Sequence, residues 1–532
     1  MKNTKKTFSI ILSALICLSV CACGNSSNTS TSAETSQTEA AVTAEEAVTT
    51  TTDNSEAVES TAENTTDTER NDKPGDPPDG QGGEGGTPPE MPDGNGGPGG
   101  TPPDGNGGNP PDMPGGGGGG FGGGSSSADI SYSGAVEITS ADSQDSRTYA
   151  SDTADQSALL ISTSDEVAVT NATVTKTGNS DGGDNCNFYG LNAAVLVKDG
   201  TTTTITGGTV TSDASGANGV FCYGGNGGQN GATGDGTTLI ISGTKIVTPG
   251  DGSGGIMTTG GGITYAYDLD VETSGQSSAA IRTDRGGGTV VVDGGTYTSN
   301  GLGSPAIYST ADITVSNAAL TSNLSEGVCI EGLNSITLNN CDLTANNTKC
   351  NGNATFLDTI MIYQSMSGDA ASGTSSFTMT GGSLTSRNGH VFHVTNTSAV
   401  ITLNGVTIVN EDADNILLSV CADGWSGGSN TAVLKAIAQE LSGTILVGSD
   451  STLNLELTEG SAFTGCIGGE ITNSKGTTVS TEVGTVSVTL DSTSTWTLTG
   501  DTYLTGFNGD AANIISNGYK LYVNGVEMTG TM

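Results

Sequence analysis

Residues 292–343 read VDGGTYTSNGLGSPAIYSTADITVSNAALTSNLSEGVCIEGLNSITLNNCDL, and this stretch decides the fold. One pattern occurs in it three times, at 292–297, 315–320 and 338–343. Each copy is an aliphatic residue, a polar residue, a two-residue turn signal, a polar residue and a second apolar residue. The copies start 23 residues apart. Self-similarity at such a period is typical of a solenoid, in which each repeat stacks on the next.

The same pattern continues outside this stretch. Further copies start at Val169, Ile205, Ile241, Met379 and Leu403, with a degenerate copy at Ala266. The basic unit is 23 to 26 residues, three units carry inserts, and each unit has a second aliphatic run such as the one ending at Ile281 or Ile307. Short strands without a helical period predict an all-β, right-handed parallel β-helix of the pectate-lyase-like kind. Asn and Gly at the corners tolerate the left-handed backbone that sharp bends need.

Two other folds were weighed against this pattern. A leucine-rich repeat has units of similar length, but its LxxLxLxxN signature is missing from this chain. An array of β-sandwiches predicts alternating hairpins without a fixed phase. The constant phase therefore favours the β-helix.

Composition restricts the function. The 532 residues include 83 Gly, 57 acidic, 16 basic and 2 His residues, for a net charge of −41. We expect no nucleic-acid partner, because binding phosphates needs clustered Lys and Arg. Chemistry that needs several histidines is excluded by count. Seven cysteines lie beyond the N-terminal region, and their long spacings and odd number favour small core residues over a disulfide framework.

The N-terminal quarter of the chain predicts export. Residues 1–22 combine a basic start with an apolar run at 8–20, which is too short for a stable membrane span. The end of this segment resembles a bacterial lipobox, which implies lipidation at Cys23 and attachment to the membrane through the lipid alone. Residues 23–125 are rich in Ser, Thr and Glu and then in Pro and Gly, and they predict a disordered stalk. The chain is thus expected at the cell surface, as a monomer.

The remaining residues divide into two parts of one solenoid. Residues 126–440 are predicted to form the main parallel β-helix, and 441–532 its last rungs and cap. Residues 431–441 fit either a short helix or an extended rung, because periodicity does not distinguish the two.

A column of polar and aromatic residues is the predicted binding site. We aligned the second strand of successive units on their isoleucines, which places Arg282, Tyr308, Glu331 and Tyr363 one above another on the outer face. Tyr223 is expected to join them. Stacked aromatic rings with a few charged groups suit sugar rings, which need a flat apolar surface and polar contacts. The alternative is a solvated face on which the tyrosines cover the coil edges.

Arg282 and Asp284 carry a second hypothesis, because basic residues are rare in this chain. Together with Arg285 they could clamp a uronate carboxylate. Pectate-lyase-like enzymes, which share this fold, use an Arg or Lys as base beside bound calcium. An Arg–Asp ion pair that braces the following glycine turn is the interpretation we favour.

Two further groups could carry chemistry. Asp268, Asp270 and Glu272 alternate along one strand and could bind Ca²⁺, although an acidic, solvated surface explains them as well. His390 and His393 are three residues apart, so on a regular strand they point to opposite faces and act together only if the strand carries a bulge. We assign no catalytic residue and do not expect an enzyme on this basis.

The segment 494–504, STWTLTGDTYL, resembles rungs of autotransporter-type adhesin passengers, which are β-helices of the bacterial surface. The repeats are also similar to those of clostridial β-helix carbohydrate-binding proteins that hold calcium. These resemblances imply an adhesin or carbohydrate-binding protein whose partner is an extracellular polysaccharide or glycoprotein. The lipobox-like segment at Cys23 replaces the membrane β-barrel by which autotransporters are anchored, so we expect this protein to be lipid-anchored. The alternatives are a calcium-assisted polysaccharide lyase or glycoside hydrolase, and a structural surface spacer.

Overall fold

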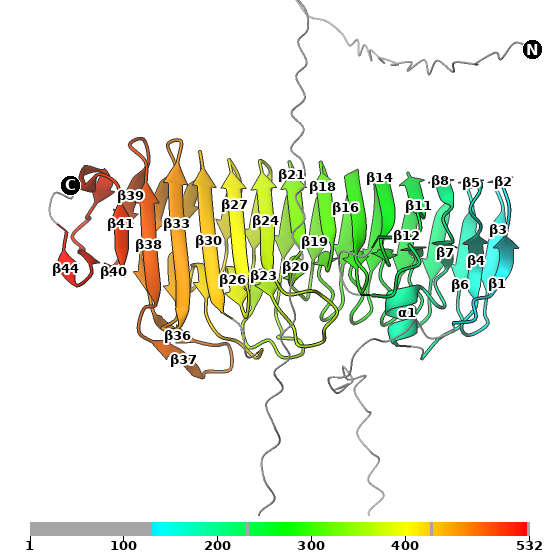
Figure 1. Ribbon diagram of the computed structural model, residues 1–532, viewed down its shortest axis with the longest axis horizontal. Helices are drawn as coiled ribbons and strands as arrows, with labels where there is room; N and C mark the ends of the chain where they lie inside the picture. Colours follow the sequence, from blue (N-terminus) through cyan, green and yellow to red (C-terminus); the bar gives the residue numbers. More distant parts are fainter. Residues whose placement is uncertain (1–129, 182, 229–232, 426–428, 529–532) are drawn as a thin grey trace, which may run out of the picture. The chain divides into compact units, whose positions relative to one another are not determined.

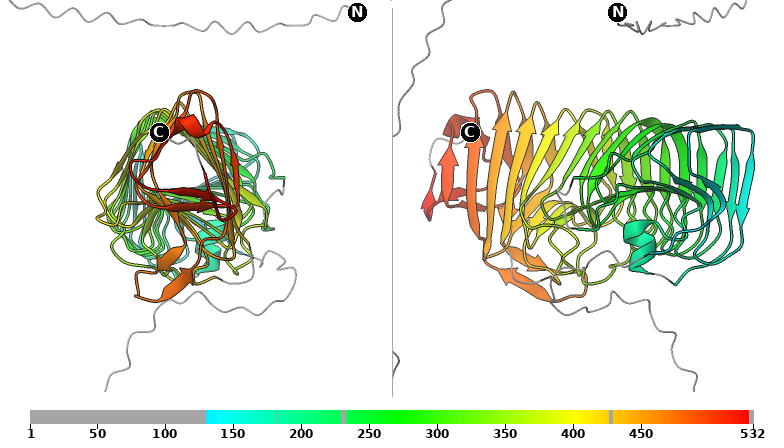
Figure 2. Two further views of the ribbon diagram at one scale, coloured as in Figure 1. Left: turned by 90° about the vertical axis from the view of Figure 1, so that its left-hand side faces the viewer. Right: turned by 45° about the vertical axis from the view of Figure 1, so that its right-hand side comes forward.

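The computed structural model describes residues 130–181, 183–228, 233–425 and 429–528, and these form a parallel β-helix. The predicted signal segment, Cys23 and the stalk lie outside the described residues. Strands of successive rungs pair in parallel along the stack (Figure 1), and the end-on view shows a roughly three-sided cross-section (Figure 2). No helix in the described residues is long and apolar enough to cross a membrane.

The first side of the solenoid is a sheet of 13 parallel strands. It runs through β1 (Gly134–Ile138), β4 (Ser157–Ser162), β7 (Val195–Lys198), β10 (Val220–Tyr223), β13 (Ile256–Thr259), β15 (Ile281–Thr283), β17 (Ile307–Ser309), β20 (Val328–Glu331), β23 (Asp358–Tyr363), β26 (His390–Thr395), β29 (Ile416–Val420), β32 (Thr444–Val447) and β35 (Ile467–Gly468). This sheet carries most of the predicted binding residues on its outer face.

The repeated sequence pattern forms the other two sides of the solenoid. In each rung, one strand of the pattern precedes the corner and one strand follows it. The strand before the corner is β2 (Asp142–Asp145), β5 (Glu166–Thr170), β8 (Thr202–Thr206), β11 (Thr238–Ser242), β18 (Asp312–Ser316), β21 (Ser335–Asn339), β24 (Thr374–Thr380), β27 (Ser398–Asn404), β30 (Asn430–Ile437), β33 (Ser451–Thr458), β38 (Thr485–Leu490) or β41 (Gly506–Asn508). The strand after it is β3 (Thr148–Ser151), β6 (Thr173–Lys176), β9 (Thr209–Ser212), β12 (Lys245–Thr248), β19 (Ala319–Ser322), β22 (Asp342–Ala345), β25 (Ser383–Ser386), β28 (Thr407–Asn410), β31 (Glu440–Ser442), β34 (Ala462–Gly465), β39 (Thr495–Leu498) or β42 (Ile514–Ile515). Two long strands, β14 (Gly262–Thr273) and β16 (Gly288–Ser299), pass through the corner.

A few short elements complete the structure. They are the helix α1 (Asp184–Tyr189), the antiparallel hairpin of β36 (Glu470–Thr472) and β37 (Thr478–Thr481), the C-terminal strands β40 (Thr502–Leu504), β43 (Leu521–Val523) and β44 (Val526–Glu527), and a 3₁₀ turn at Ala511–Asn513. The segment that fitted either helix or strand is extended, as β30 and β31. The parallel stack also continues beyond residue 440.

The predicted phase of the repeat agrees with the register of the sheets. Val292 pairs with Val315, and Val315 pairs with Leu338. Across the long insert Leu338 pairs with Met379, so the extra residues do not displace the strand that follows them. All four side chains are fully buried in one aliphatic column, because a single rung cannot cover its own inward face.

The corners have the backbone geometry that their residues predict. Asn317 and Asn340 adopt φ of 55° and 51°, in the left-handed region. Residues other than Gly, Asn and Asp rarely enter this region, because the Cβ atom approaches the following carbonyl oxygen. The corner residues therefore allow each rung to bend between its two outer strands.

Candidate functional site

Loops cover much of the outer face of the first sheet, so the predicted column is less open than the sequence suggested. A second apolar cluster lies on this face beneath α1, with Phe188, Tyr189 and Tyr223 among its members. Tyr223 is only 6% exposed, and its ring meets that of Tyr189 edge-on with centroids 5.8 Å apart. Burial raises the pKa of Tyr223 to about 12. Tyr223 therefore helps to hold α1 against the rungs.

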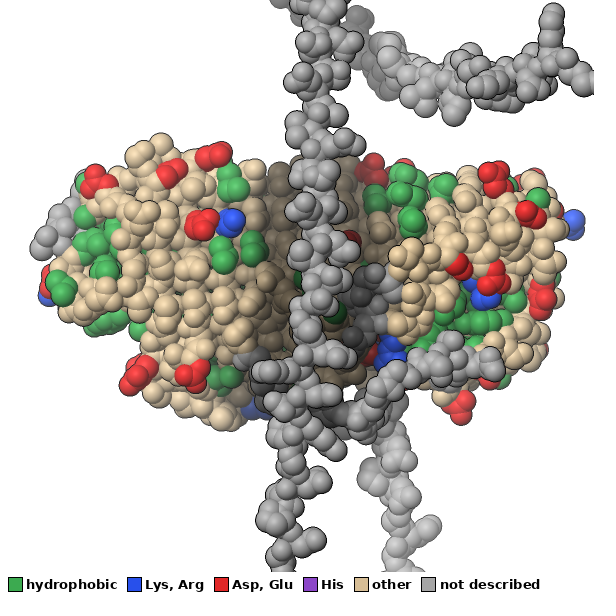
Figure 3. Space-filling model, in the orientation of Figure 1, with side chains coloured by type: hydrophobic (Ala, Val, Ile, Leu, Met, Phe, Trp, Pro, Cys, Tyr) green, Lys and Arg blue, Asp and Glu red, His purple; other side chains and the backbone are tan. Residues whose placement is uncertain are grey.

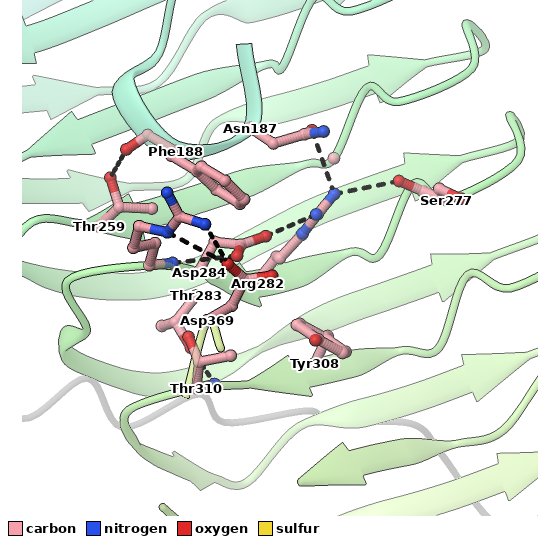
Figure 4. Close-up of polar contacts among 12 residues, drawn as sticks. Asn187, Phe188, Thr259, Ser277, Arg282, Thr283, Asp284, Tyr308, Thr310 and Asp369 are labelled. Carbon is pink, nitrogen blue, oxygen red and sulfur yellow. Dashed lines mark hydrogen bonds and ion pairs between the residues drawn. The ribbon is translucent and has the colours of Figure 1, made fainter. Parts of the chain in front are cut away.

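Arg282 and Asp284 form an internal ion pair. The Nη2 atom of Arg282 lies 2.6 Å from the Asp284 Oδ2 atom, and the side chains are 13% and 4% exposed. Nη1 of Arg282 also donates to Ser277 O, at 3.2 Å, and to Asn187 Oδ1, at 3.4 Å, from the helix α1 (Figure 4). Burial raises the pKa of Asp284 to about 6 despite the adjacent guanidinium. The ion-pair interpretation is confirmed, and the guanidinium makes three hydrogen bonds within the protein.

Arg285 ties two loops to this pair. Its Nε and Nη2 atoms donate to Asp369 Oδ1, at 3.1 and 2.6 Å, and its guanidinium lies 4.3 Å from the centre of the Phe188 ring. Its backbone N–H donates to Asp284 Oδ1 at 3.0 Å. The loop that contains Asp369, the helix α1 and the glycine turn after Arg285 are therefore fastened to one point.

Glu331 is the centre of a hydroxyl network. Tyr308 and Tyr363 donate to its Oε2 atom at 2.5 and 3.2 Å, while Ser365 and Ser367 donate to Oε1. The glutamate is only 2% exposed. Burial, reinforced by the Glu331 carboxylate, raises the pKa of both tyrosines well above the usual value. Glu331 thus fixes the tyrosine rings and the loop that begins at Gln364.

The predicted column was wrong in its register at Tyr223 and at Glu331. Tyr223 does not join the Arg282 column, because Arg282 pairs with Met257 and Met257 pairs with Phe221, two residues before Tyr223. Arg282 pairs with Tyr308, as expected, but Tyr308 pairs with Cys329 rather than with Glu331. Glu331 instead lies two residues further along its strand and pairs with Tyr363. The residues share one face but occupy two adjacent columns, because the loop before β20 is shorter than the alignment on isoleucines assumed.

Trp425 is an aromatic residue that sequence reasoning missed. Its ring centre lies 4.8 Å from that of Tyr363, with the planes inclined by 51°, and both side chains remain partly exposed. Its distance from Tyr363 in the sequence hid the contact. A tryptophan in a loop was the only available signal. The pair offers an apolar ring surface beside the Glu331 network.

An open groove of 740 Å³ lies at the edge of this face and crosses five rungs. One in-register column of side chains lines it, since successive pairings join Ile263, Thr289, Asp312, Ser335 and Ser376. The groove therefore follows the long axis of the solenoid. Rungs are about 4.8 Å apart, so the column extends for about 19 Å.

The walls of this groove are mostly uncharged. They include the glycine turn at 286–288 and the backbone of Gly236 and Gly261, with Leu333 as an exposed apolar side chain. Asp312 is the one charged side chain among the residues that line it, and it accepts a hydrogen bond from Ser335 Oγ at 2.6 Å. The fastening of the 286–288 turn through Arg285 gives this wall a fixed shape.

The acidic residues considered for calcium lie on another side of the solenoid. Asp268, Asp270 and Glu272 are all exposed, and Asp268 occupies the corner of β14 with φ of 49°. Asp270 pairs with Lys245 at 2.6 Å, and Glu272 accepts from Asn300 at 3.3 Å. Among the described residues, no three His, Cys, Asp or Glu side chains are placed to hold a metal ion.

The two histidines approach each other, contrary to the expectation for a regular strand. Val391 and Phe392 both enter the core, which breaks the alternation and leaves His390 and His393 on the outer side. Nδ1 of each imidazole lies 2.7 Å from the Oγ atom of Ser419. Nε2 of His393 lies 3.4 Å from Asp423 Oδ2, and both side chains are fully buried.

Asp423 is itself held in place by loop groups. Its Oδ1 atom accepts from Thr355 N at 2.8 Å, from Thr355 Oγ1 at 2.5 Å and from Gly424 N at 2.7 Å. The neighbouring His393 and these donors keep the pKa of Asp423 below its usual value despite burial. Ser419 thus bridges His390 and His393, and Asp423 lies beside His393.

These observations define the class of protein as a parallel β-helix with an axial groove beside a loop-covered face. No family model, curated protein or solved structure matches the chain. On the face shown in Figure 3, acidic side chains are scattered among uncharged ones, and Lys and Arg are few. The function is therefore argued from the site.

Proposed function

We propose that this protein binds an extended, uncharged polysaccharide chain in the axial groove. The observation that carries the proposal is the direction of the groove, which follows one column of side chains across five rungs. A linear polymer can lie along such a column and meet similar hydroxyl and backbone groups at each rung. The neutral walls favour a chain without carboxylates, since the protein as a whole carries a charge of −41 and repels polyanions.

The predicted site residues have a positioning role in this proposal. Arg282, Asp284 and Arg285 fix the turn that forms one wall, and Glu331 fixes the rung that carries Leu333. The Tyr363–Trp425 pair supplies a partly exposed aromatic surface on the same side of the molecule. Because both arginines are engaged in ion pairs, the arrangement supports binding better than the lyase alternative, which needs a free base.

The proposal also places the β-helix outside the cell. Its support is the sequence alone, namely the lipobox at Cys23 and the stalk composition of 23–125. Replacing Cys23 with alanine should release the protein from membranes into the soluble fraction. An unchanged membrane fraction in the Cys23→Ala variant would remove the anchoring part of the proposal.

Binding is tested with one substitution in the groove and one outside it. Thr289 and Thr296 are both exposed threonines of β16, but only Thr289 lines the groove. Thr289→Trp should weaken binding of neutral oligosaccharides (glucan, xylan or mannan type) by tenfold or more in calorimetry, and Thr296→Trp should not. Equal binding by both variants would exclude the groove.

The same preparations separate the alternatives. A lyase would increase the ultraviolet absorbance of polygalacturonate in a calcium-dependent way, as unsaturated products form. A glycoside hydrolase would release reducing ends from the neutral polymers. A structural spacer would bind none of the polymers. We expect binding without either product.

A further inference from the structure

A lysine is buried inside the solenoid at a position where the neighbouring rungs have a serine. Lys176 is the last residue of β6, and its side chain is fully buried. It pairs with Ser151 of one neighbouring rung and with Ser212 of the other. Ser212 donates to the carbonyl of Ala217 at 2.6 Å, so a serine is enough to bind the loop that follows the strand. Because burying an amine is costly, the presence of the lysine requires an explanation.

The contacts of Lys176 suit an uncharged amine. Its Nζ atom donates to Thr153 O at 2.9 Å and to Gly178 O at 2.5 Å. A protonated lysine has three donors, whereas a neutral amine has two donors and a lone pair, so these two carbonyls satisfy the neutral form. No carboxylate in the described residues lies within ion-pair distance of this nitrogen. Burial lowers the pKa of Lys176 to about 8, although the charges of Asp155 and Asp152 partly oppose the effect.

The side-chain amide of Asn192 is bound to the same carbonyl. Its Nδ2 atom donates to Gly178 O at 3.0 Å, and the residue is only 1% exposed. The nitrogens of Lys176 and Asn192 therefore meet at one oxygen, and they are at most 5.5 Å apart, which is the sum of their distances to it. Asn192 Oδ1 is buried without a hydrogen-bond partner in the described part of the chain, which is rare for a native polar group. An amine and a primary amide are thus held side by side, away from water.

The two side chains belong to segments that a bond between them would tie together. Lys176 ends β6, and Asn192 lies between α1 and β7. The segment from 177 to 191 contains α1, which packs on the first sheet through Phe188 and Tyr189. A covalent link from residue 176 to residue 192 would close this segment at its base and fix the helix against the rungs.

We propose that Lys176 and Asn192 form an intramolecular isopeptide bond. The lone pair of Lys176 Nζ attacks the Cγ atom of Asn192, and a bond forms between these two atoms. The bond between Cγ and Nδ2 then breaks, and the departing nitrogen takes the proton that Nζ gives up and leaves as ammonia. A lysine amine and a primary amide thus become one secondary amide and ammonia, without an oxidant or a second reactant. Neither residue lines the axial groove, so this proposal is independent of the proposed function.

Mass spectrometry of the trypsin-digested protein tests the proposal. Trypsin cleaves after unmodified Lys and Arg, so without the bond residues 148–176 and 177–198 are released as separate peptides. The bond blocks cleavage after Lys176, and we expect one peptide of residues 148–198 whose mass is lower than its sequence requires by one ammonia. Lys176→Met should give the same peptide without this loss. Lys245→Met, which replaces an exposed lysine of β12, should retain the loss in residues 148–198.

Two results would overturn the proposal. One is a parent digest in which residues 148–198 retain their full mass, whether or not trypsin cleaves after Lys176. The other is a Lys176→Met peptide that still lacks one ammonia, because that loss would come from an asparagine that cyclises with its own backbone. The parent protein alone gives the first result, so the proposal can be rejected even if Lys176→Met folds poorly.

Discussion

Replacing Glu331 with alanine tests whether the outer-face network is held by one carboxylate. Four hydroxyl groups donate to this side chain, which is almost fully buried. Ser365 and Ser367 also lie 2.7 Å from each other and can compensate through that contact. Tyr308 and Tyr363 lose their shared acceptor.

The expected loss follows from the two tyrosines. A hydrogen bond to a charged group contributes about 1.5 to 3 kcal/mol, and removing the carboxylate also recovers the cost of burying it. We therefore expect the Glu331→Ala variant to lose about 3 kcal/mol of unfolding free energy in urea. Glu331→Gln should lose less, because its amide oxygen still accepts one of the hydroxyl groups.

The assay combines urea unfolding with hydrogen exchange. In the Glu331→Ala variant, the amides of Gly332 and Leu333 should exchange faster, because they bond to Tyr363 O at the end of β23 and to Ala371 O in the released loop. Glu272→Ala is the control, since Glu272 is exposed on another side of the solenoid. If Glu331→Ala and Glu272→Ala differ by less than 0.5 kcal/mol, roughly the size of an ordinary surface effect, the carboxylate is not the organising group.

Three other predictions concern stability. Burial lowers the pKa of His390 from 6.5 to about 3, so the unfolded chain takes up this proton at a higher pH than the folded chain does. The free energy of unfolding should therefore fall as the pH drops from 6.5 toward 3, by up to about 1.4 kcal/mol per pH unit. His390→Gln should flatten that part of a plot of urea midpoint against pH. Ser419→Ala leaves both imidazole Nδ1 atoms without their partner and should cost about 1 to 3 kcal/mol, whereas Ser449→Ala at an exposed turn should cost almost nothing; equal midpoints would show that the contact is unimportant. At the corner with φ of 51°, Asn340→Val should lower stability by about 1 to 2 kcal/mol and Asn340→Gly should be close to neutral, and a valine variant as stable as the parent in thermal melting would contradict the backbone argument.

The fold was predictable because its determinants are local and repeated. The spacing from Val292 to Val315 and Leu338 sets which residues pair across rungs, and Asn or Gly marks each bend. These signals do not depend on the inserts between them. The conformation of 431–441 was open in the sequence, because its apolar pattern fitted both a short helix and an extended rung, and stacking of β30 against β27 and β33 decides it.

The site was less predictable because it depends on contacts between distant segments. The sequence alignment placed Glu331 in the same column as Tyr308, because it matched Ile330 with Ile307. In the structure Ile307 pairs with Val328, the preceding inward residue of β20. The approach of His390 and His393 required two consecutive residues in the core, which strict alternation does not anticipate. The local sequence does not reveal which residues Asp369 and Trp425 contact, because their partners lie elsewhere in the sequence.

The pairing of Leu338 with Met379 shows that a long insert leaves the strands on either side of it in register. An insert therefore changes the positions of the rungs above and below it very little, provided that the chain leaves and re-enters the stack at the same edge of the sheet. Foreign peptides spliced into this edge should be tolerated, and several could be presented side by side at the rung spacing. The architecture is thus suited to grafting, where recognition is changed by exchanging loops while the scaffold stays intact.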